Sequence, residues 1–491
     1  MKQPIQYLGS YILPNGKAAV GDLRIEGPNT ILQLHSDEVL TSVDGATCIE
    51  GTSYTGERVT LLDCISHGSG VTGINGEDSR YHASVFPHYV AIGRSYIKPD
   101  QAHISSIQFT TSDLTTLFYD FDAFSSVVDA KSIIDTVLQE RRRIRPVEAG
   151  ERPQVLYFTG KDCIAEVSTA IGKVSVHHCP SYSMGGPTGI FMKNRIVVSI
   201  DPESPIVFDE AVGRMYDVAN FLSVVAGRVQ SIEHVHVTTT EVNDDITQSL
   251  AIHPSLSWGA EGEIEKNKPH PGDVPLDPIR RYAEFDSVLT DWISRHSGWR
   301  VARSRYLECI RQENKYGPDR LVAAANMFDI LPIDAIPLVN ELPKDLAATR
   351  DACVDLFSKH ARGIDRDSAL SSLKRLGKPS LPKKVNYRVS IVASKLGGRF
   401  PDLDLVASTA VKCRNYFVHG SSGNFDYSKM DPLVPFFTNA LEFIFATSDL
   451  IESGWDAQRW NLEMHGWGHS FARFRSEYDA SLAALRRALA K

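Results

Sequence analysis

The chain has 491 residues, of which 42% are hydrophobic and 23% are charged, an ordinary composition for a soluble globular protein. Its length exceeds what one hydrophobic core usually serves, so we expect two or three domains. No run of residues approaches the roughly 18 apolar positions that a membrane-spanning helix needs. Residues 1–7 lack the apolar core of a signal peptide, so we expect a cytoplasmic protein with no membrane partner.

The cysteine and histidine patterns argue against a structural metal. The seven cysteines are dispersed and no C-x-x-C occurs, which is typical neither of a disulfide framework nor of a zinc module. Two histidine-containing segments, 177–179 and 234–236, lack the spaced partner pairs of a known metal site. We therefore expect no metal and no cofactor.

The net charge of −8 is unevenly distributed along the chain. Residues 1–277 hold 21 Lys and Arg against 35 Asp and Glu, a net charge of −14, whereas residues 278–491 hold 31 against 25, a net charge of +6. The basic part is the better candidate for binding a polyanion. Its densest cationic stretch, 362–399, is either a solvated helical face with a basic loop or a groove that follows RNA phosphates. In the second interpretation, the RNA-binding residues are Lys374, Arg375, Lys383, Lys384 and Arg388.

The N-terminal part is predicted to consist of strands. Short alternating segments recur at 21–25, 30–34, 58–62, 89–93 and 104–109, with turn residues between them. A Gly- and Ser-rich stretch, 66–79, is typical of a surface loop. We place a first β-rich domain at residues 1–138, followed at 139–152 by a linker or helix end. Its run of four arginines at 141–145 is most simply explained as solvated.

A second β unit with one helix is predicted at residues 153–243. Residues 195–200 and 235–239 have strand patterns, whereas residues 208–227 have an apolar face with helical period. Gly227 is the expected C-terminal cap of that helix. Residues 244–277 carry many Pro, Gly and acidic residues, which indicates an irregular domain boundary.

From residue 278 to the end, the pattern is helical. Pro and Gly separate the expected helices, which are 283–296, 299–314, 318–331, 345–360, 366–376, 384–396, 403–418, 432–453 and 470–489. The sequence thus predicts an α+β multidomain fold, with a sandwich-like β-rich N-terminal half followed by an all-α domain at 278–491.

Arg414 and His419 carry the clearest chemical signal. A ribonuclease without metal needs a group that moves a proton at the 2′-hydroxyl or the leaving oxygen, and histidine has a suitable pKa. It also needs a cation with directed donors for the charge that builds on the phosphoryl oxygens, and arginine supplies one. Five positions along a helix separate two side chains by about 140°. The pair therefore meets only if the helix stops, as residues 420–423 suggest, or if a second chain contributes.

The spacing alone is weakly specific. The pairs Arg228–His234 and Arg459–His465 have a similar spacing, but neither has an Asn directly after the Arg or a Gly directly after the His. The structural alternative for Arg414 and His419 is a buried histidine at a helix end beside an unrelated surface arginine. Spacing leaves both interpretations open.

Residues 411–420, Val-Lys-Cys-Arg-Asn-Tyr-Phe-Val-His-Gly, resemble the R-N-x-x-x-H signature of HEPN ribonucleases, including its apolar lead-in and trailing glycine. The segment 319–331 also resembles the ApeA-type branch of this group. In the N-terminal half, the segments 21–25, 51–64 and 92–93 resemble the ApeA N-terminal domain, and 208–227 fits the helix that closes it. The resemblance spans nearly the whole chain.

This resemblance implies an anti-phage protein that acts by abortive infection. Its HEPN domain is expected to form a helical bundle and to cleave host RNA, with tRNA as the expected target, when the N-terminal sensor half detects a phage-derived trigger. Arg414 and His419 match the catalytic pair, and Asn415 matches the polar residue that orients them. Cleavage is expected through attack by the 2′-hydroxyl, in a homodimer or higher homo-oligomer.

Two alternatives belong to other functional classes. Some HEPN domains are non-catalytic modules that bind a partner protein or a nucleotide, commonly when the Arg or His is lost. Both residues are present here, which favours the enzyme. A third interpretation makes the acidic β-rich half a ligand-binding module with the main role.

Overall fold

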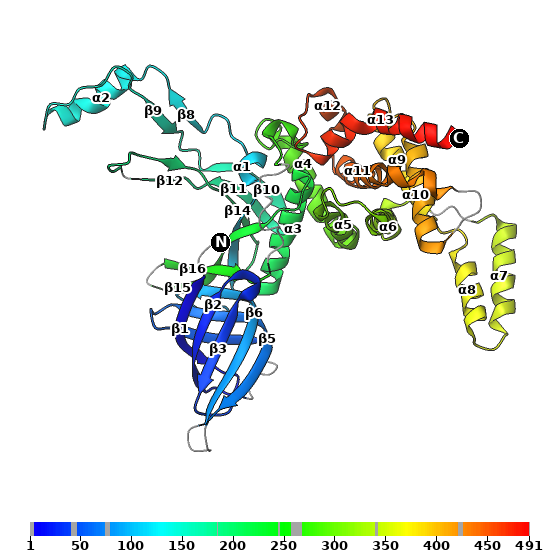
Figure 1. Ribbon diagram of the computed structural model, residues 1–491, viewed down its shortest axis with the longest axis horizontal. Coiled ribbons are helices and arrows are strands. Elements are labelled where there is room, and N and C mark those ends of the chain that lie inside the picture. Colours follow the sequence, from blue (N-terminus) through cyan, green and yellow to red (C-terminus); the bar gives the residue numbers. More distant parts are fainter. Residues whose placement is uncertain are drawn as a thin grey trace. The chain divides into compact units, whose positions relative to one another are not determined.

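The computed structural model describes residues 4–40, 47–73, 79–183, 185–243, 246–256, 268–338, 342–420 and 426–490. The chain divides into two compact units, Met1–Ile293 and Ser294–Lys491. The first unit holds the strands and the second is helical (Figure 1). This confirms the predicted fold class, a β-rich N-terminal region followed by an all-α region. Within the described residues, every helix is too short or too polar to cross a bilayer.

The first six strands close into an antiparallel barrel with the neighbour order β6-β3-β2-β1-β4-β5 and a final pairing of β5 with β6. Closure, in place of the sandwich-like arrangement, leaves no strand edge in this part of the sheet. The buried side chains alternate along the strands, so that one face of each strand fills the barrel. The six strands are β1 (Ile5–Ile12), β2 (Ala18–Ile25), β3 (Ile31–Ser36), β4 (Cys48–Ser53), β5 (Arg58–Thr72) and β6 (Arg80–Gly93).

Two glycines make room for a tyrosine inside the barrel. Tyr11 is fully buried, and its ring lies over Gly21 on one neighbouring strand and Gly51 on the other. A Cβ at Gly21 would stand 2.6 Å from the ring, and one at Gly51 would be closer still. The two positions therefore accept only glycine without repacking of the core.

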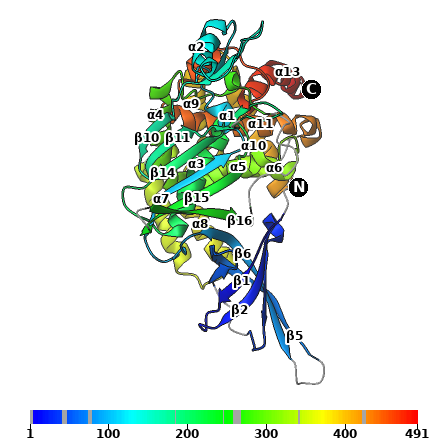
Figure 2. The same ribbon diagram turned by 90° about the vertical axis from the view of Figure 1, so that its left-hand side faces the viewer.

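The β5–β6 hairpin extends beyond the barrel (Figure 2). The predicted loop at 66–79 is therefore wrong for 66–72, which belong to β5, whereas β6 begins directly after it at Arg80. Small polar residues suit this ribbon because most of its residues beyond the barrel are exposed. Residues 74–78, in the last part of the predicted loop, lie outside the described residues.

The sheet continues from the barrel because β6 pairs with two neighbours on the same side. Its first half pairs with β3 and its second half with β16. From there the neighbour order is β16-β15-β7-β14-β11-β10, formed by β7 (Ile104–Thr111), β10 (Cys163–Thr169), β11 (Gly172–His178), β14 (Ile196–Asp201), β15 (Ile232–Asn243) and β16 (Ile246–Pro254). The predicted irregular boundary at 244–277 is thus wrong for 246–254, where the acidic and Pro-rich surroundings masked a strand.

Helix α3 (Phe208–Ala226) covers this second part of the sheet and contacts β7 (Figure 2). Its apolar stripe is buried, and Gly227 adopts a φ of 70° and donates its N–H to the carbonyls of Ser223 and Val224. The predicted helix and its glycine cap are both confirmed. The cap uses the left-handed region that glycine enters without strain.

Smaller elements complete the first unit: η1 (Gly27–Asn29), α1 (Leu114–Leu117), β8 (Phe124–Val127), α2 (Lys131–Arg142), β9 (Val155–Phe158), β12 (Ser181–Tyr182), β13 (Met192–Lys193), η3 (Pro271–Asp273) and α4 (Tyr282–Ser294). Helix α4 packs here through Phe285, which contacts Phe118 and Phe221, and through Trp292. The division between the units therefore follows α4. The domain limits 1–138, 153–243 and 278–491 stay predictions.

Helix α11 occupies the centre of the second unit and is buried along almost its whole length. It contacts α5, α6, α9, α10 and α13. The helices of this unit are α5 (His296–Arg311), α6 (Pro318–Asp329), α7 (Lys344–Ser358), α8 (Ile364–Arg375), α9 (Leu381–Leu396), α10 (Leu403–His419), α11 (Val434–Glu452), α12 (Ala457–Leu462) and α13 (Ser470–Ala490), with short turns η4 (Ile333–Ala335), η5 (Tyr427–Lys429) and η6 (Asp431–Leu433).

The nine predicted helices match α4 to α11 and α13, with ends shifted by a few residues. The short α12 was missed, although Asp456 caps it by accepting a hydrogen bond from the backbone of Arg459. Helices α7 and α8 form a hairpin that projects from the bundle (Figure 1), and neither contains a buried residue.

Candidate active site

Helix α10 carries the Arg-Asn-x-x-x-His segment on its last turns. Its apolar face packs against α6, α9 and α11. The helix ends at His419, and Gly420 follows with a φ of 79° and donates its N–H to the carbonyl of Tyr416. The predicted stop is present at Gly420, while residues 421–423 lie outside the described residues.

Arg414 and His419 do not converge within one chain. The helix continues through His419, so the two side chains are about 140° apart around its axis. His419 is exposed and Arg414 is mostly buried, with 15% of its side chain accessible. This is the reverse of the structural alternative, which assumed a buried histidine and a surface arginine.

The guanidinium of Arg414 is held by one residue of its own helix and two of α6. Nη1 donates to Oδ1 of Asn415 at 3.1 Å, and Nη2 donates to Oδ1 of Asn326 at 2.7 Å. The carboxylate of Asp329 lies 3.7 Å from Nη2. Neither Asn326 nor Asp329 was predicted as a site residue, although both lie in the segment 319–331 that resembles the ApeA-type branch. Two polar residues three positions apart near the end of a helix are common on solvated faces, so the pattern alone did not assign them a role.

The five predicted RNA-binding residues differ in their exposure. Lys374 and Arg375 are exposed on α8, and together with Lys378 they line an open groove of about 460 Å³. Lys383 is exposed at the start of α9. Lys384, in contrast, keeps only 13% of its side chain accessible and donates to the backbone carbonyl of Asp329 at 2.6 Å.

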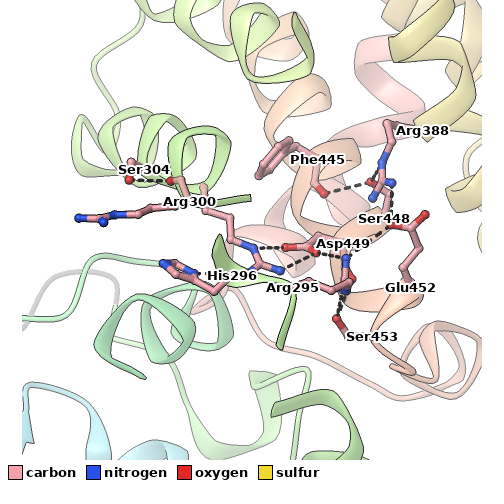
Figure 3. A network of polar contacts seen from close by, with 11 residues as sticks. Arg295, His296, Arg300, Ser304, Arg388, Phe445, Ser448, Asp449, Glu452 and Ser453 are labelled. Atoms are coloured by element: carbon pink, nitrogen blue, oxygen red, sulfur yellow. Dashed lines mark hydrogen bonds and ion pairs between the residues drawn. The ribbon is translucent and has the colours of Figure 1, made fainter. Parts of the chain in front are cut away.

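Arg388 is fully buried, which corrects its prediction as an RNA contact. Its guanidinium donates to Oγ of Ser448 at 2.9 Å and to the carboxylate of Glu452 at 2.6 Å (Figure 3). It also lies 4.9 Å from the centre of the Trp299 ring. The residue appeared cationic and surface-like in sequence because its partners lie 60 residues or more further along the chain.

Arg388 belongs to a larger buried network around Asp449. Arg303 donates to both oxygens of this carboxylate, at 2.9 and 3.0 Å, and Arg295 lies 3.1 Å from it. Burial alone raises the pKa of Asp449, but the charges of Arg303, Arg295 and Arg388 outweigh it and lower the pKa. These contacts fix α5 and α9 against α11, which supports the helices that carry the site.

An aromatic cluster joins the end of α10 to the segment that follows. The rings of Tyr416 and Tyr427 stack with centroids 4.6 Å apart, and Phe417 meets Tyr427 edge-on at 4.6 Å. The hydroxyl of Tyr427 donates to Asp431 at 2.6 Å. Tyr427 was not predicted as part of the site, although its ring packs against two residues of the last turn of α10.

The histidines weighed as metal ligands make hydrogen bonds within the protein. His177 contacts Oγ of Ser175 at 2.8 Å, and His178 contacts the side-chain amide of Asn194 at 2.9 Å. Across the described ranges, no three His, Cys, Asp or Glu side chains gather in a way that would hold a metal ion.

Comparison with models of protein families matches two regions of the chain. Residues 6–295 match ApeA N-terminal domain 1, and residues 338–459 match an Apea-like HEPN domain. Arg414, Asn415 and His419 lie inside the second match, whereas α6 precedes it. No curated protein and no solved structure matches the chain.

Proposed function

Since the chain belongs to the ApeA family of anti-phage HEPN proteins, we propose that it is a metal-independent endoribonuclease whose site comprises Arg414, Asn415 and His419. The observation that carries this proposal is the exposure of His419 together with the fixed position of the Arg414 guanidinium. His419 is exposed at the end of α10. The guanidinium of Arg414, on the same helix, is held by hydrogen bonds to Asn415 of α10 and Asn326 of α6. A proton-transfer group open to substrate and a fixed cation are what the reaction requires.

The reaction follows from these two groups. His419 accepts the proton of the 2′-hydroxyl and returns a proton to the leaving 5′-oxygen, so that the imidazole ends in its starting protonation state. The 2′-oxygen attacks phosphorus and the bond to the 5′-oxygen breaks, which leaves a 2′,3′-cyclic phosphate and a 5′-hydroxyl. Arg414 offsets the charge that builds on the phosphoryl oxygens. Asn415 accepts a hydrogen bond from Arg414 and orients it.

A second copy of the chain completes the site in this proposal. The 140° between Arg414 and His419 on one helix places them on different sides of α10. In a two-fold dimer, each α10 can present its histidine to the partner's half of the cleft, because the same surface meets itself across the axis. The proposed assembly is therefore a homodimer or a higher homo-oligomer.

The other parts of the chain take supporting roles. Lys374 and Arg375, with the exposed Lys383, hold the RNA backbone, and tRNA is the proposed substrate. The acidic N-terminal half receives the phage-derived trigger. The proposed location is the cytoplasm, where host RNA is available.

The test is cleavage of bulk tRNA by the purified protein in EDTA, beside Arg414→Ala and His419→Ala, with the fragment ends mapped. Cleavage by the wild type alone, with cyclic-phosphate ends, supports the proposal. Equal cleavage by wild type and His419→Ala overturns the site. If none of the three proteins cleaves, the growth arrest that each causes on expression is compared. Arrest that depends on His419 supports a nuclease that needs its trigger, and arrest that does not depend on it favours a non-catalytic binding module.

A further inference from the structure

Arg414 contacts α6 through a directed hydrogen bond to Asn326, in addition to the packing of the two helices. We propose that Asn326 is a positioning residue of the active site, which fixes the guanidinium of Arg414 for the scissile phosphate, and that Asp329 and Lys384 adjust the charge around it. This inference rests on the proposed function. Asn326 lies before residue 338, where the HEPN family match begins, so the match itself does not point to it.

Asn326 and Asp329 are three residues apart on α6 and therefore share one face of the helix. That face meets α10, since Oδ1 of Asn326 accepts from Nη2 of Arg414 at 2.7 Å and Asp329 lies 3.7 Å from the same nitrogen. The guanidinium thus has one neutral acceptor at hydrogen-bond distance on α6 and another, Asn415, on its own helix.

Helix α6, which carries Asn326, is joined to α11 by a buried ion pair. Arg320, near the start of α6, donates to both oxygens of the buried Glu442 on α11, at 2.8 and 2.9 Å. A two-point contact between buried charges holds the helix in one orientation. A positioning residue on such a helix can hold a partner side chain more precisely than one on a loop.

A neutral acceptor suits this role better than a carboxylate. An amide oxygen orients the guanidinium and leaves its full charge for the phosphate, and each terminal nitrogen of an arginine has two protons, so that one contact leaves another proton free. The nearby Asp329 does carry a charge, but Lys384 lies 3.9 Å from its carboxylate and offsets it. The net positive charge of the cluster therefore stays on Arg414.

The kinetic test compares four variants of the full-length protein in the tRNA assay. Asn326→Ala should lower kcat by about 10- to 100-fold with KM unchanged, because a misplaced group costs rate and not binding. Asn326→Asp keeps the acceptor and should recover part of kcat, while its extra negative charge raises KM. Asp329→Asn removes a negative charge and should lower KM. Asn386→Ala, at an exposed asparagine of α9, should behave as wild type.

A second measurement is independent of activity. Phenylglyoxal modifies accessible guanidinium groups, and peptide mass spectrometry gives the rate for each arginine. Arg414 should react slowly in wild type and several-fold faster in Asn326→Ala, while the exposed Arg459 reacts equally in both. Melting temperatures of all the variants should stay close to that of wild type.

Three results overturn the inference: wild-type kcat in Asn326→Ala, an unchanged modification rate of Arg414, or a loss of melting temperature that accounts for the loss of rate. If the wild type fails the tRNA test and arrests growth independently of His419, the proposed function falls and the catalytic role of Asn326 falls with it. A faster modification of Arg414 in Asn326→Ala would then still support the contact itself.

Discussion

The side chains of Arg414 and Asn326 lie 2.7 Å apart, although 88 residues separate them in the chain. One belongs to the helix that carries the Arg-Asn-x-x-x-His segment, and the other belongs to a helix that lies outside both family matches. The candidate site is therefore assembled by the packing of α6 on α10, and it depends on the helical core as a whole.

Replacement of His419 by alanine should abolish RNA cleavage and leave the fold intact. Loss of a general acid–base group lowers rate by about 100- to 10,000-fold, and His419 is exposed. Cleavage of tRNA in EDTA and the thermal melting curve measure the two effects. The matched control is His360→Ala, at another exposed histidine of the helical unit, which should cleave at the wild-type rate. Comparable losses in both variants would count against the assigned role.

The double variant Lys374→Ala and Arg375→Ala should bind RNA more weakly without a loss of stability. Helix α8 has no buried residue, so its exposed side chains contribute little to stability. Loss of two phosphate contacts should reduce the slope of log K against log salt concentration by roughly one to two. Binding of 2′-O-methyl RNA, which cannot be cleaved by 2′-hydroxyl attack, is measured at several salt concentrations. Arg300→Ala, at an exposed position of α5, serves as control. An unchanged salt dependence in the double variant would remove α8 from the RNA-binding surface.

Arg388→Ala should destabilise the helical unit and affect RNA binding only through folding. The change removes the hydrogen bonds to Ser448 and Glu452 and the contact with Trp299. Glu452 stays partly accessible and keeps Arg295 at 3.8 Å, so we expect the loss typical of a hydrogen bond to a charged group, about 1.5–3 kcal/mol. Chemical denaturation gives the free energy of unfolding. Lys383→Ala, an exposed residue of the same helix, should change it little. A stable Arg388→Ala variant with weaker RNA affinity would restore the original prediction for this residue.

Gly51→Ala should destabilise the barrel. The new methyl group would overlap the ring of the buried Tyr11, and overpacking of a filled core costs about 1–3 kcal/mol. Gly186→Ala is the control, because a Cβ there meets nothing within 4 Å and its φ is not positive. Denaturation of the two variants compares the effects. Equal stability of Gly51→Ala and wild type would mean that the barrel can shift to accept the methyl group.

Local patterns in the sequence predicted much of the fold. The apolar period of α3, its cap at Gly227 and the end of α10 at Gly420 were all readable, because these features depend on residues within about one helical turn of each other. The spacing of Arg414 and His419 left two interpretations open, and the resemblance of the whole segment 411–420 to the R-N-x-x-x-H signature made it the candidate site. Charge counts alone separated an acidic N-terminal part from a basic C-terminal part.

Only the tertiary structure decided which polar side chains are buried and what they contact. Arg388 and Lys374 are both cations on helices in one basic stretch, yet the first is buried beside Glu452 and the second lines an open groove. Closure of the barrel likewise depends on β6 reaching β3, across a long stretch of chain. A local pattern reports on neighbours in sequence, whereas burial and ion pairing depend on residues that folding brings together from distant positions.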